Sequence, residues 1–305
     1  MSIPTSRTEE MATVTIDQVK CNGCGKCVTV CSDFGFKIIN GKAARSEEPL
    51  FGCLACGHCM AVCPENAIDV TGRCLTPDDL FPFTEPSVKP DYNSLLQLFQ
   101  SRRSMRKFKD QTVSREVIDL ILTAAQTAPM GLPPSDVNVV VLQGKEKVRQ
   151  FSSDFCSLLD KNRWLVSGWF TALMTPFYDR KTILLFKKFM RPLFDIYIGS
   201  MKKGIDLVTY DAPVAFYFYG SPYCDPADPI IAATYAMTAA ESLGLGSCML
   251  GAIHPFLQSG FGVKSFRSKY RIRFKSREGL VLIVGYPKVK YARGVKRTFA
   301  NVDFF

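Results

Sequence analysis

The sequence predicts an α+β protein made of two parts, and three observations lead to this prediction. A cysteine-rich run occurs twice within residues 1–73. A proline-rich stretch, residues 74–90, follows without lasting periodicity and is expected to be a linker. Patterns typical of helices and strands then alternate through residues 91–305, which predicts helices around a mixed sheet. A chain of 305 residues has room for about two such domains.

The first part is an internal duplication of cysteines. Eight of the twelve cysteines form two copies of the pattern Cys-x2-Cys-x2-Cys-x3-Cys, 32 residues apart. Pro64 follows the second copy, whereas Ser32 follows the first. The run ending in proline is the bacterial ferredoxin signature for [4Fe–4S] clusters, in which the fourth cysteine of each run ligates the other cluster. The predicted metal ligands are Cys21, Cys24, Cys27 and Cys63 for one cluster, and Cys53, Cys56, Cys59 and Cys31 for the other.

Zinc sites and disulfides are the alternatives for so many cysteines. Zinc sites usually take four ligands in two pairs with a longer spacer between them, and two tandem runs fit that spacing poorly. Disulfides fit poorly because the first twenty residues lack the apolar centre of a secretion signal. We therefore expect iron–sulfur ligation and a cytoplasmic protein.

The second part, residues 91–305, predicts helices and buried strands in alternation. An apolar stripe begins at Asp91, and Ser114 is a favourable residue type to cap a second helix. A run of small residues predicts a closely packed helix between two continuous apolar runs. The expected helices after Asp91 are 114–128 and 226–243, and the expected strands are 138–143, 214–219 and 280–285.

Four segments of this part occur in an order that is typical of one family. Each alone is also typical of a turn or of a solvated basic helix end, so only the combination is specific. They are Arg102-Arg103-Ser104-x-Arg106-x-Phe108, Ala128-Pro129-x-Gly131-x-Pro133-Pro134-Ser135-Asp136, Gly244-Leu245-Gly246-Ser247-Cys248-x-x-Gly251, and Gly285-Tyr286-Pro287 with Lys290 and Arg293 beyond. In these segments the second part resembles the FMN-dependent nitroreductase family, and the whole chain resembles its ferredoxin-fused branch.

The resemblance implies residues that bind FMN. It assigns the phosphate to Arg102, whose planar fork suits phosphate oxygens, and less directly to Lys290, Arg293 and Arg297. It places Ser104 by the ribityl chain or ring and Arg106 near the N1/O2 edge, with Arg103 in the same motif. The Gly246–Ser247 loop is expected to bring backbone N–H groups to the N5/O4 edge, because glycine permits close approach. Many relatives have an asparagine in the second segment where this chain has none, and Ser135 is the candidate replacement.

The sequence assigns no catalytic side chain, because in this family the flavin itself carries the electrons. Only two histidines are present, and we expect His58 to lie beside the second cluster and His254 to be structural. No G-x-G-x-x-G follows a strand, so the sequence shows no NAD(P)H site.

Charge and resemblance together indicate the partners. Residues 1–90 carry a net charge of −3 and the remainder +13. A basic body attracts acidic partners, and since nothing resembles a nucleic-acid reader, we expect an acidic electron donor such as ferredoxin. The family resemblance implies a homodimer. Residues 160–205, where both tryptophans lie among Lys and Arg, are expected to form a helical lid or dimer contact, and membrane contact is the less favoured interpretation.

The sequence thus predicts an oxidoreductase. Electrons from a one-electron donor such as reduced ferredoxin are expected to pass through two [4Fe–4S] clusters to FMN, and from there to a nitroaromatic, a quinone or an activated alkene. The alternative is an electron-transfer or redox-sensing module whose acceptor is another protein. A roomy apolar pocket over the flavin favours the first, and a protein-facing ring favours the second.

Overall fold

The computed structural model describes residues 3–83, 89–177 and 179–305. Residues 84–88, part of the predicted linker, lie outside the described residues. The chain divides into two compact units. The first contains Met1–Lys89 together with Pro129–Val137 and Gly220–Asp228, and the second contains Pro90–Ala128, Asn138–Tyr219 and Pro229–Phe305.

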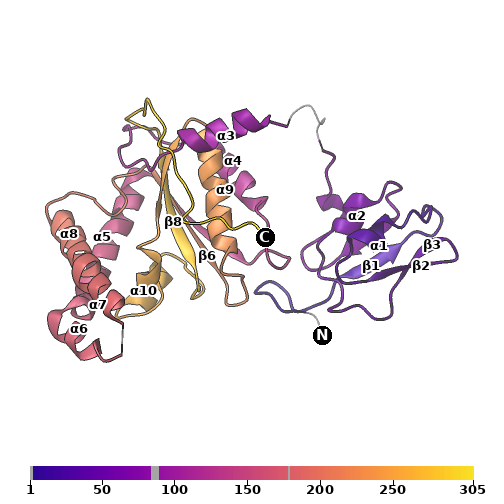
Figure 1. The fold of residues 1–305 in the computed structure, drawn as a ribbon, viewed down its shortest axis with the longest axis horizontal. Coiled ribbons are helices and arrows are strands. Elements are labelled where there is room, and N and C mark those ends of the chain that lie inside the picture. The colour runs from indigo at the N-terminus through magenta and orange to yellow at the C-terminus, as the bar shows by residue number, and fades with distance from the viewer. Residues whose placement is uncertain (1–2, 84–88, 178) are drawn as a thin grey trace. The chain divides into compact units, whose positions relative to one another are not determined.

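The first unit consists of two short antiparallel strand pairs and two five-residue helices (Figure 1). Strand β1 (Thr13–Ile16) pairs with β4 (Ile68–Thr71), and β2 (Phe36–Ile39) pairs with β3 (Lys42–Arg45). The helices are α1 (Lys26–Val30) and α2 (His58–Val62), and a 3₁₀ turn η1 (Pro77–Asp79) follows β4. A small core that includes Phe36, Met60 and Val70 holds these elements together.

The duplication in the sequence is a duplication in the structure. Helices α1 and α2 each begin one residue before the third cysteine of a run and end one residue before the fourth. Gly25 (φ 73°) and Gly57 (φ 75°) precede them in the left-handed region, which glycine adopts without strain. The repeated cysteines are therefore presented by two equivalent loop–helix turns.

Buried polar side chains hold the segments 129–137 and 220–228 within the first unit. Asp136 is 4% exposed and accepts hydrogen bonds from Ser6 Oγ (2.6 Å) and Ser221 Oγ (2.7 Å). Arg73, 3% exposed, donates to the carbonyls of Glu10 (2.8 Å) and Pro133 (2.9 Å). These two segments are thus bonded to one another and to the N-terminal part of the chain.

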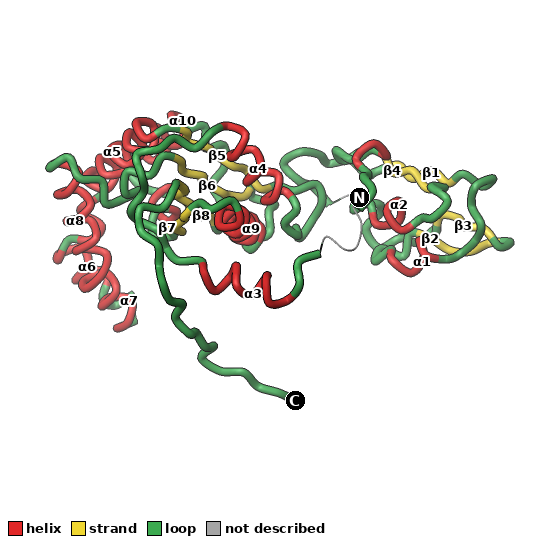
Figure 2. Tube along the Cα trace, turned by 90° about the horizontal axis from the view of Figure 1, so that it is seen from above, coloured by secondary structure: helices red, strands yellow, loops and turns green. Residues whose placement is uncertain are grey.

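The second unit is built on a four-stranded sheet with the order β5-β6-β8-β7. Its strands are β5 (Val137–Gln143), β6 (Val214–Gly220), β7 (Gly246–Leu250) and β8 (Gly279–Gly285), and β8 runs antiparallel to both β6 and β7. Every residue of β6 and β8 is buried, which is typical of a strand covered on both faces. Helix α9 (Asp228–Ser242) covers one face, and α5 (Lys145–Lys161) and α10 (Val263–Lys269) cover the other (Figures 1 and 2).

The remaining helices of the second unit surround this sheet. Asp91 and Ser114 cap α3 (Tyr92–Ser101) and α4 (Arg115–Gln126), as expected. Between residues 160 and 205 the described residues form several short helices, and no helix among the described residues is long and apolar enough to cross a membrane. The further elements are η3 (Arg163–Val166), α6 (Gly168–Met174), α7 (Arg180–Leu185), η4 (Phe186–Met190), α8 (Arg191–Lys202) and η5 (His254–Leu257).

The expected strands and helices of the second part are all present, and one expectation is corrected. The segment containing Gly246 and Ser247 was expected to be a loop, but it forms strand β7 at the edge of the sheet. Its five residues pair with β8 from Gly246 opposite Gly285 to Leu250 opposite Val281. Gly–Leu–Gly sequences are typical of turns, and this preference is overridden here by pairing with a strand distant in the chain.

Candidate functional site: two cysteine-lined cavities and a buried polar pair

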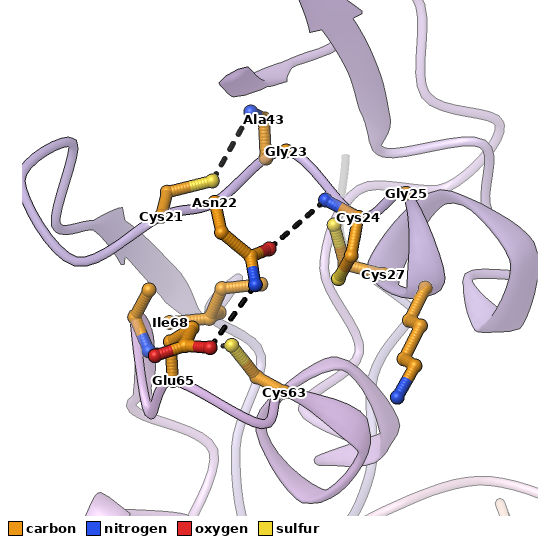
Figure 3. A pocket seen from close by; sticks show the side chains of 12 residues that line it. Cys21, Asn22, Gly23, Cys24, Gly25, Cys27, Ala43, Cys63, Glu65 and Ile68 are labelled. Carbon is orange, nitrogen blue, oxygen red and sulfur yellow. Dashed lines mark hydrogen bonds between the residues drawn. The ribbon is translucent and has the colours of Figure 1, made fainter. Parts of the chain in front are cut away.

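The first cavity of the N-terminal unit is lined by Cys21, Cys24, Cys27 and Cys63 (Figure 3). Three of these come from the first cysteine run and the fourth from the end of the second run. A hydrogen bond from Asn22 to Glu65 (3.0 Å) joins the two loops at the rim, and Asn22 also accepts from the backbone N–H of Cys24 (3.1 Å). The structure thus brings together one complete set of predicted ligands.

The second cavity is lined by Cys31, Cys53, Cys56 and Cys59, the other predicted set. His58 and Arg45 also line it, as do Met130, Gly131 and Pro133 from the segment 129–137. His58 therefore lies beside the cysteines of the second set, where we expected it. The same segment carries Ser135 and Asp136 immediately after Pro133.

Backbone N–H groups point at several of these sulfur atoms. Cys31 Sγ accepts from Gly35 N (3.4 Å), and Cys63 Sγ accepts from Ala67 N (3.3 Å), so the fourth cysteine of each run makes the same bond. Cys21 Sγ accepts from Ala43 N (3.4 Å), and this bond lowers the pKa of the Cys21 thiol. Such bonds stabilise thiolate sulfur, the form that ligates iron.

Burial acts in the opposite direction on Cys59. Its removal from solvent raises the pKa of the thiol to about 12. None of the twelve cysteines forms a disulfide. Each cavity is lined by four cysteines drawn from both runs, and four thiolates are the number of ligands that one [4Fe–4S] cluster takes. The donor set fits [4Fe–4S] clusters.

A cation from β3 lies near each cysteine set, and Lys26 of α1 also lines the first cavity. Lys42 Nζ donates to the carbonyl of Cys21 in the first set. Arg45 lines the second cavity, and its guanidinium carbon lies 5.2 Å from the centre of the Phe36 ring. Positive charge near a cluster stabilises the additional negative charge that the cluster takes up on reduction.

Three of the four segments of the second part that carry the family resemblance meet in the second unit. Met105 N donates to Ser247 O (2.8 Å), and Ser104 forms a parallel bridge with Ser247. Lys109 N donates to Tyr286 O (2.8 Å), and Phe108 bridges Pro287. The extended segment 102–109 therefore joins an end of β7 to an end of β8, although it lies more than 130 residues before either of them in the sequence.

Two buried polar atoms at this junction have no partner among the described residues. They are Ser247 Oγ, on a side chain that is fully buried, and Arg103 Nη2. A buried polar group without a partner costs about 1–3 kcal/mol, and a polar ligand removes that cost. The two unpartnered atoms therefore favour a polar ligand at this junction.

Gly246 has a packing role besides the one predicted for it. A Cβ added there would lie 2.7 Å from Met105 Cγ and 3.3 Å from Pro287 Cβ. Glycine is thus required for the packing of Met105 against β7, whatever ligand binds nearby. Arg103, Met105 and Lys290 line a cavity of about 240 Å³ on this side, together with Ser101 and Glu241.

Arg106 contacts Tyr210, a residue to which the sequence gave no role. Its guanidinium carbon lies 5.7 Å from the centre of the Tyr210 ring, a cation–π distance. Tyr210 (φ 57°) and Asp211 (φ 51°) both adopt the left-handed conformation, which is uncommon for residues other than glycine. No local sequence signal predicts this strained turn, because the partner that holds Tyr210 lies a hundred residues earlier.

The other predicted residues are more dispersed. Arg102 and Ser104 are half-buried, and Lys290, Arg293 and Arg297 are exposed. Ser135 belongs to the first unit, where its Oγ accepts from Val137 N (3.3 Å). His254 is buried and bonds to Tyr217 through Nδ1 (2.9 Å), and burial lowers its pKa, which agrees with the structural role expected for it.

The fold and these sites define an oxidoreductase fused to an iron–sulfur module. Residues 99–286 match the model of the nitroreductase family, and the chain belongs to that family. Residues 13–69 match the model of the 4Fe-4S dicluster domain, which confirms the prediction of two [4Fe–4S] clusters.

Known relatives are distant. The FMN reductase [NAD(P)H] of Bacillus subtilis (strain 168) is 27% identical over 167 residues, which cover 53% of this chain and 55% of that protein. The chain thus spans about half the length of this curated relative. A nitroreductase with bound FMN from Bacteroides fragilis is 16% identical (70% of this chain, 98% of that chain, TM-score 0.49). Another with bound FMN from Desulfitobacterium hafniense is 21% identical (68% and 97%, TM-score 0.47).

Proposed function

We propose that this chain is a cytoplasmic, FMN-dependent oxidoreductase that draws electrons from a one-electron donor such as reduced ferredoxin through its two clusters. The proposed acceptor is a small organic molecule: a nitroaromatic, a quinone or an activated alkene. Bound FMN would supply the change from single-electron delivery to two-electron reduction of that acceptor. The observation that carries the proposal is one chain with two four-cysteine cavities and the motif junction of a nitroreductase.

The junction of β7 and β8 with the segment 102–109 is the proposed FMN site. Arg102 would bind the phosphate, helped by Lys290, Arg293 and Arg297, and Ser104 would contact the ribityl chain. The unpaired Ser247 Oγ and Arg103 Nη2 support a polar ligand at this place. Arg106, held over Tyr210, would stand where negative charge accumulates on the reduced ring. Ser135 remains a candidate flavin contact.

The C-terminal arm supports the proposed homodimer. Residues after β8 form an extended segment without helix or strand (Figure 2). Within this segment, residues 295–305 carry five exposed large apolar side chains. Such side chains are typically covered by a partner subunit. They are Val295, Phe299, Val302, Phe304 and Phe305.

The experiment is a turnover assay on the anaerobically purified holoprotein with reduced ferredoxin as donor. The Cys24→Ser variant removes a predicted ligand of the first cluster without touching the FMN junction. We expect it to lose ferredoxin-driven reduction of a nitroaromatic or quinone by at least tenfold, while turnover driven by dithionite persists. Unchanged ferredoxin-driven turnover would contradict the proposal, and flavin reduction without turnover of any small acceptor would favour a protein acceptor.

A further inference from the structure

The helical insertion, residues 160–205, has an apolar surface that the fold does not cover. Helices α7 and α8 continue through η4 from Arg180 to Lys202 and project from the sheet of the second unit (Figure 1). One apolar stripe of this long helix, which includes Phe186, Phe194 and Ile198, packs into the core. A second stripe faces solvent: Leu185 is 52% exposed, and Phe189 and Ile196 are each 51% exposed.

Helix α6 and the turn that follows it carry another exposed stripe. Trp169, Leu173 and Phe177 are 63%, 61% and 76% exposed. They recur every four residues, the spacing that places side chains along one face of a helix. Helix α6 is in contact with η4, so the two stripes belong to neighbouring elements. Few folded chains leave so many large apolar groups in water without a binding role.

Basic side chains lie among these apolar groups, and the nearby acids are engaged elsewhere. Asp195 pairs with Arg163, and Asp160 pairs with Lys202 (3.7 Å). Asp179 caps α7 by accepting from Thr182 N (2.7 Å). No carboxylate among the described residues pairs with the following five exposed cations: Arg180, Lys181, Lys187, Lys188 and Arg191.

We propose that helices α6, α7, η4 and α8 bind the surface of an anionic lipid bilayer, with these helices lying in the plane of the interface. Exposed Trp, Phe and Leu reach the boundary of the acyl chains, while Lys and Arg on the same helices contact anionic headgroups. A protein interface fits less well, because lysine is depleted from interface cores and Lys187 and Lys188 lie directly between exposed apolar residues. In a bilayer their long stems extend to the headgroups.

Surface binding is compatible with the absence of a spanning helix among the described residues. The sequence alone favoured a lid or dimer contact for this region, and the exposed apolar and basic side chains favour membrane contact instead. Lipid binding goes beyond the proposed function and does not depend on it. If the proposed function also holds, the bilayer location favours a lipid-soluble quinone among the three acceptor classes.

The test is co-sedimentation of the holoprotein with vesicles under anaerobic conditions. Vesicles of phosphatidylcholine with phosphatidylglycerol are compared with vesicles of phosphatidylcholine alone. We expect binding to the anionic vesicles and at least tenfold weaker binding of Lys187→Glu/Lys188→Glu. The matched control Lys147→Glu/Lys264→Glu makes the same change of net charge at exposed positions on α5 and α10, and it should bind as the parent does.

A second variant tests the apolar contribution. Trp169→Ser/Phe177→Ser alters two exposed side chains, and we expect it to bind at low salt but to dissociate as salt screens the headgroups. Failure of the parent to bind anionic vesicles, or equal loss in the control variant, would overturn the proposal. Conversion of the parent's dimer to monomer by Trp169→Ser/Phe177→Ser, without vesicle binding, would assign the stripes to a second copy. Ferredoxin-driven turnover of a soluble acceptor is measured in the same preparations. Turnover that persists without vesicle binding would overturn lipid binding alone and leave the proposed function intact.

Discussion

The two cysteine-lined cavities arise from one repeated motif, yet their surroundings differ. The first is lined only by residues between Cys21 and Ile68, whereas Met130, Gly131 and Pro133 complete the second. The second cavity thus borders the segment that also carries Ser135. A duplicated motif determines both ligand sets, and a later segment of the chain, residues 129–137, adds to the lining of the second cavity alone.

The largest effect is expected from the fourth cysteines, because each is predicted to serve the other run's cluster. Cys31→Ser should remove the second cluster and Cys63→Ser the first, each lowering iron by about four atoms per chain. The electron paramagnetic resonance spectrum of Cys31→Ser should then resemble that of Cys56→Ser, because both lose a ligand of the second cluster. The spectrum of Cys63→Ser should resemble that of Cys24→Ser, because both lose a ligand of the first. The opposite pairing would show that each run binds its own cluster.

Equivalent backbone positions in the two loops should respond in opposite ways. A Cβ at Gly23 (φ 75°) would lie 1.9 Å from Gly41 O, so Gly23→Ala should destabilise the unit by at least about 2 kcal/mol. The second run has Ala55 here (φ 58°), and Ala55→Gly should stabilise it by up to about 1 kcal/mol. Anaerobic thermal unfolding and the rate of iron release measure both. A more stable Gly23→Ala variant would refute the steric argument.

Arg73 should matter only to the second cavity's surroundings. The Arg73→Ala variant leaves the carbonyls of Glu10 and Pro133 without this donor, and we expect it to lower the free energy of unfolding by about 2–3 kcal/mol. Amide hydrogen exchange should increase in residues 129–137 and remain unchanged around the first cavity. The Arg73→Lys variant keeps a positive charge and a hydrogen-bond donor, so it should lose less stability than Arg73→Ala. An equal increase in amide hydrogen exchange around both cavities would contradict the claim that Arg73 acts only on the surroundings of the second cavity.

The smallest effect concerns the two cations of β3. Arg45→Gln should lower the reduction potential of the second cluster by roughly 30–60 mV, because a partly exposed cation no longer stabilises the reduced form. Lys42→Gln is the matched variant and should lower the potential of the first cluster instead. Potentiometric titration followed by electron paramagnetic resonance distinguishes them. Equal shifts of both clusters in either variant would show that the cations act only through net charge.

Local patterns predicted much of this fold. The cysteine spacing anticipated both four-cysteine sets, and apolar runs such as Val214–Tyr219 anticipated buried strands. Strand β7 was missed because its glycines favour a turn and only pairing with β8 overrides that preference. The Arg106–Tyr210 contact and the segment beside the second cavity were also missed. Both join residues far apart in the sequence, and no local periodicity records such contacts.

The central claim is that one chain carries two [4Fe–4S] clusters and FMN. Quantitative iron, sulfide and flavin analysis after anaerobic purification tests it most directly. The account predicts about eight irons and about one FMN per chain. Iron without flavin would contradict the proposed site at the junction of β7, β8 and residues 102–109, and would leave the two clusters without the acceptor proposed for them.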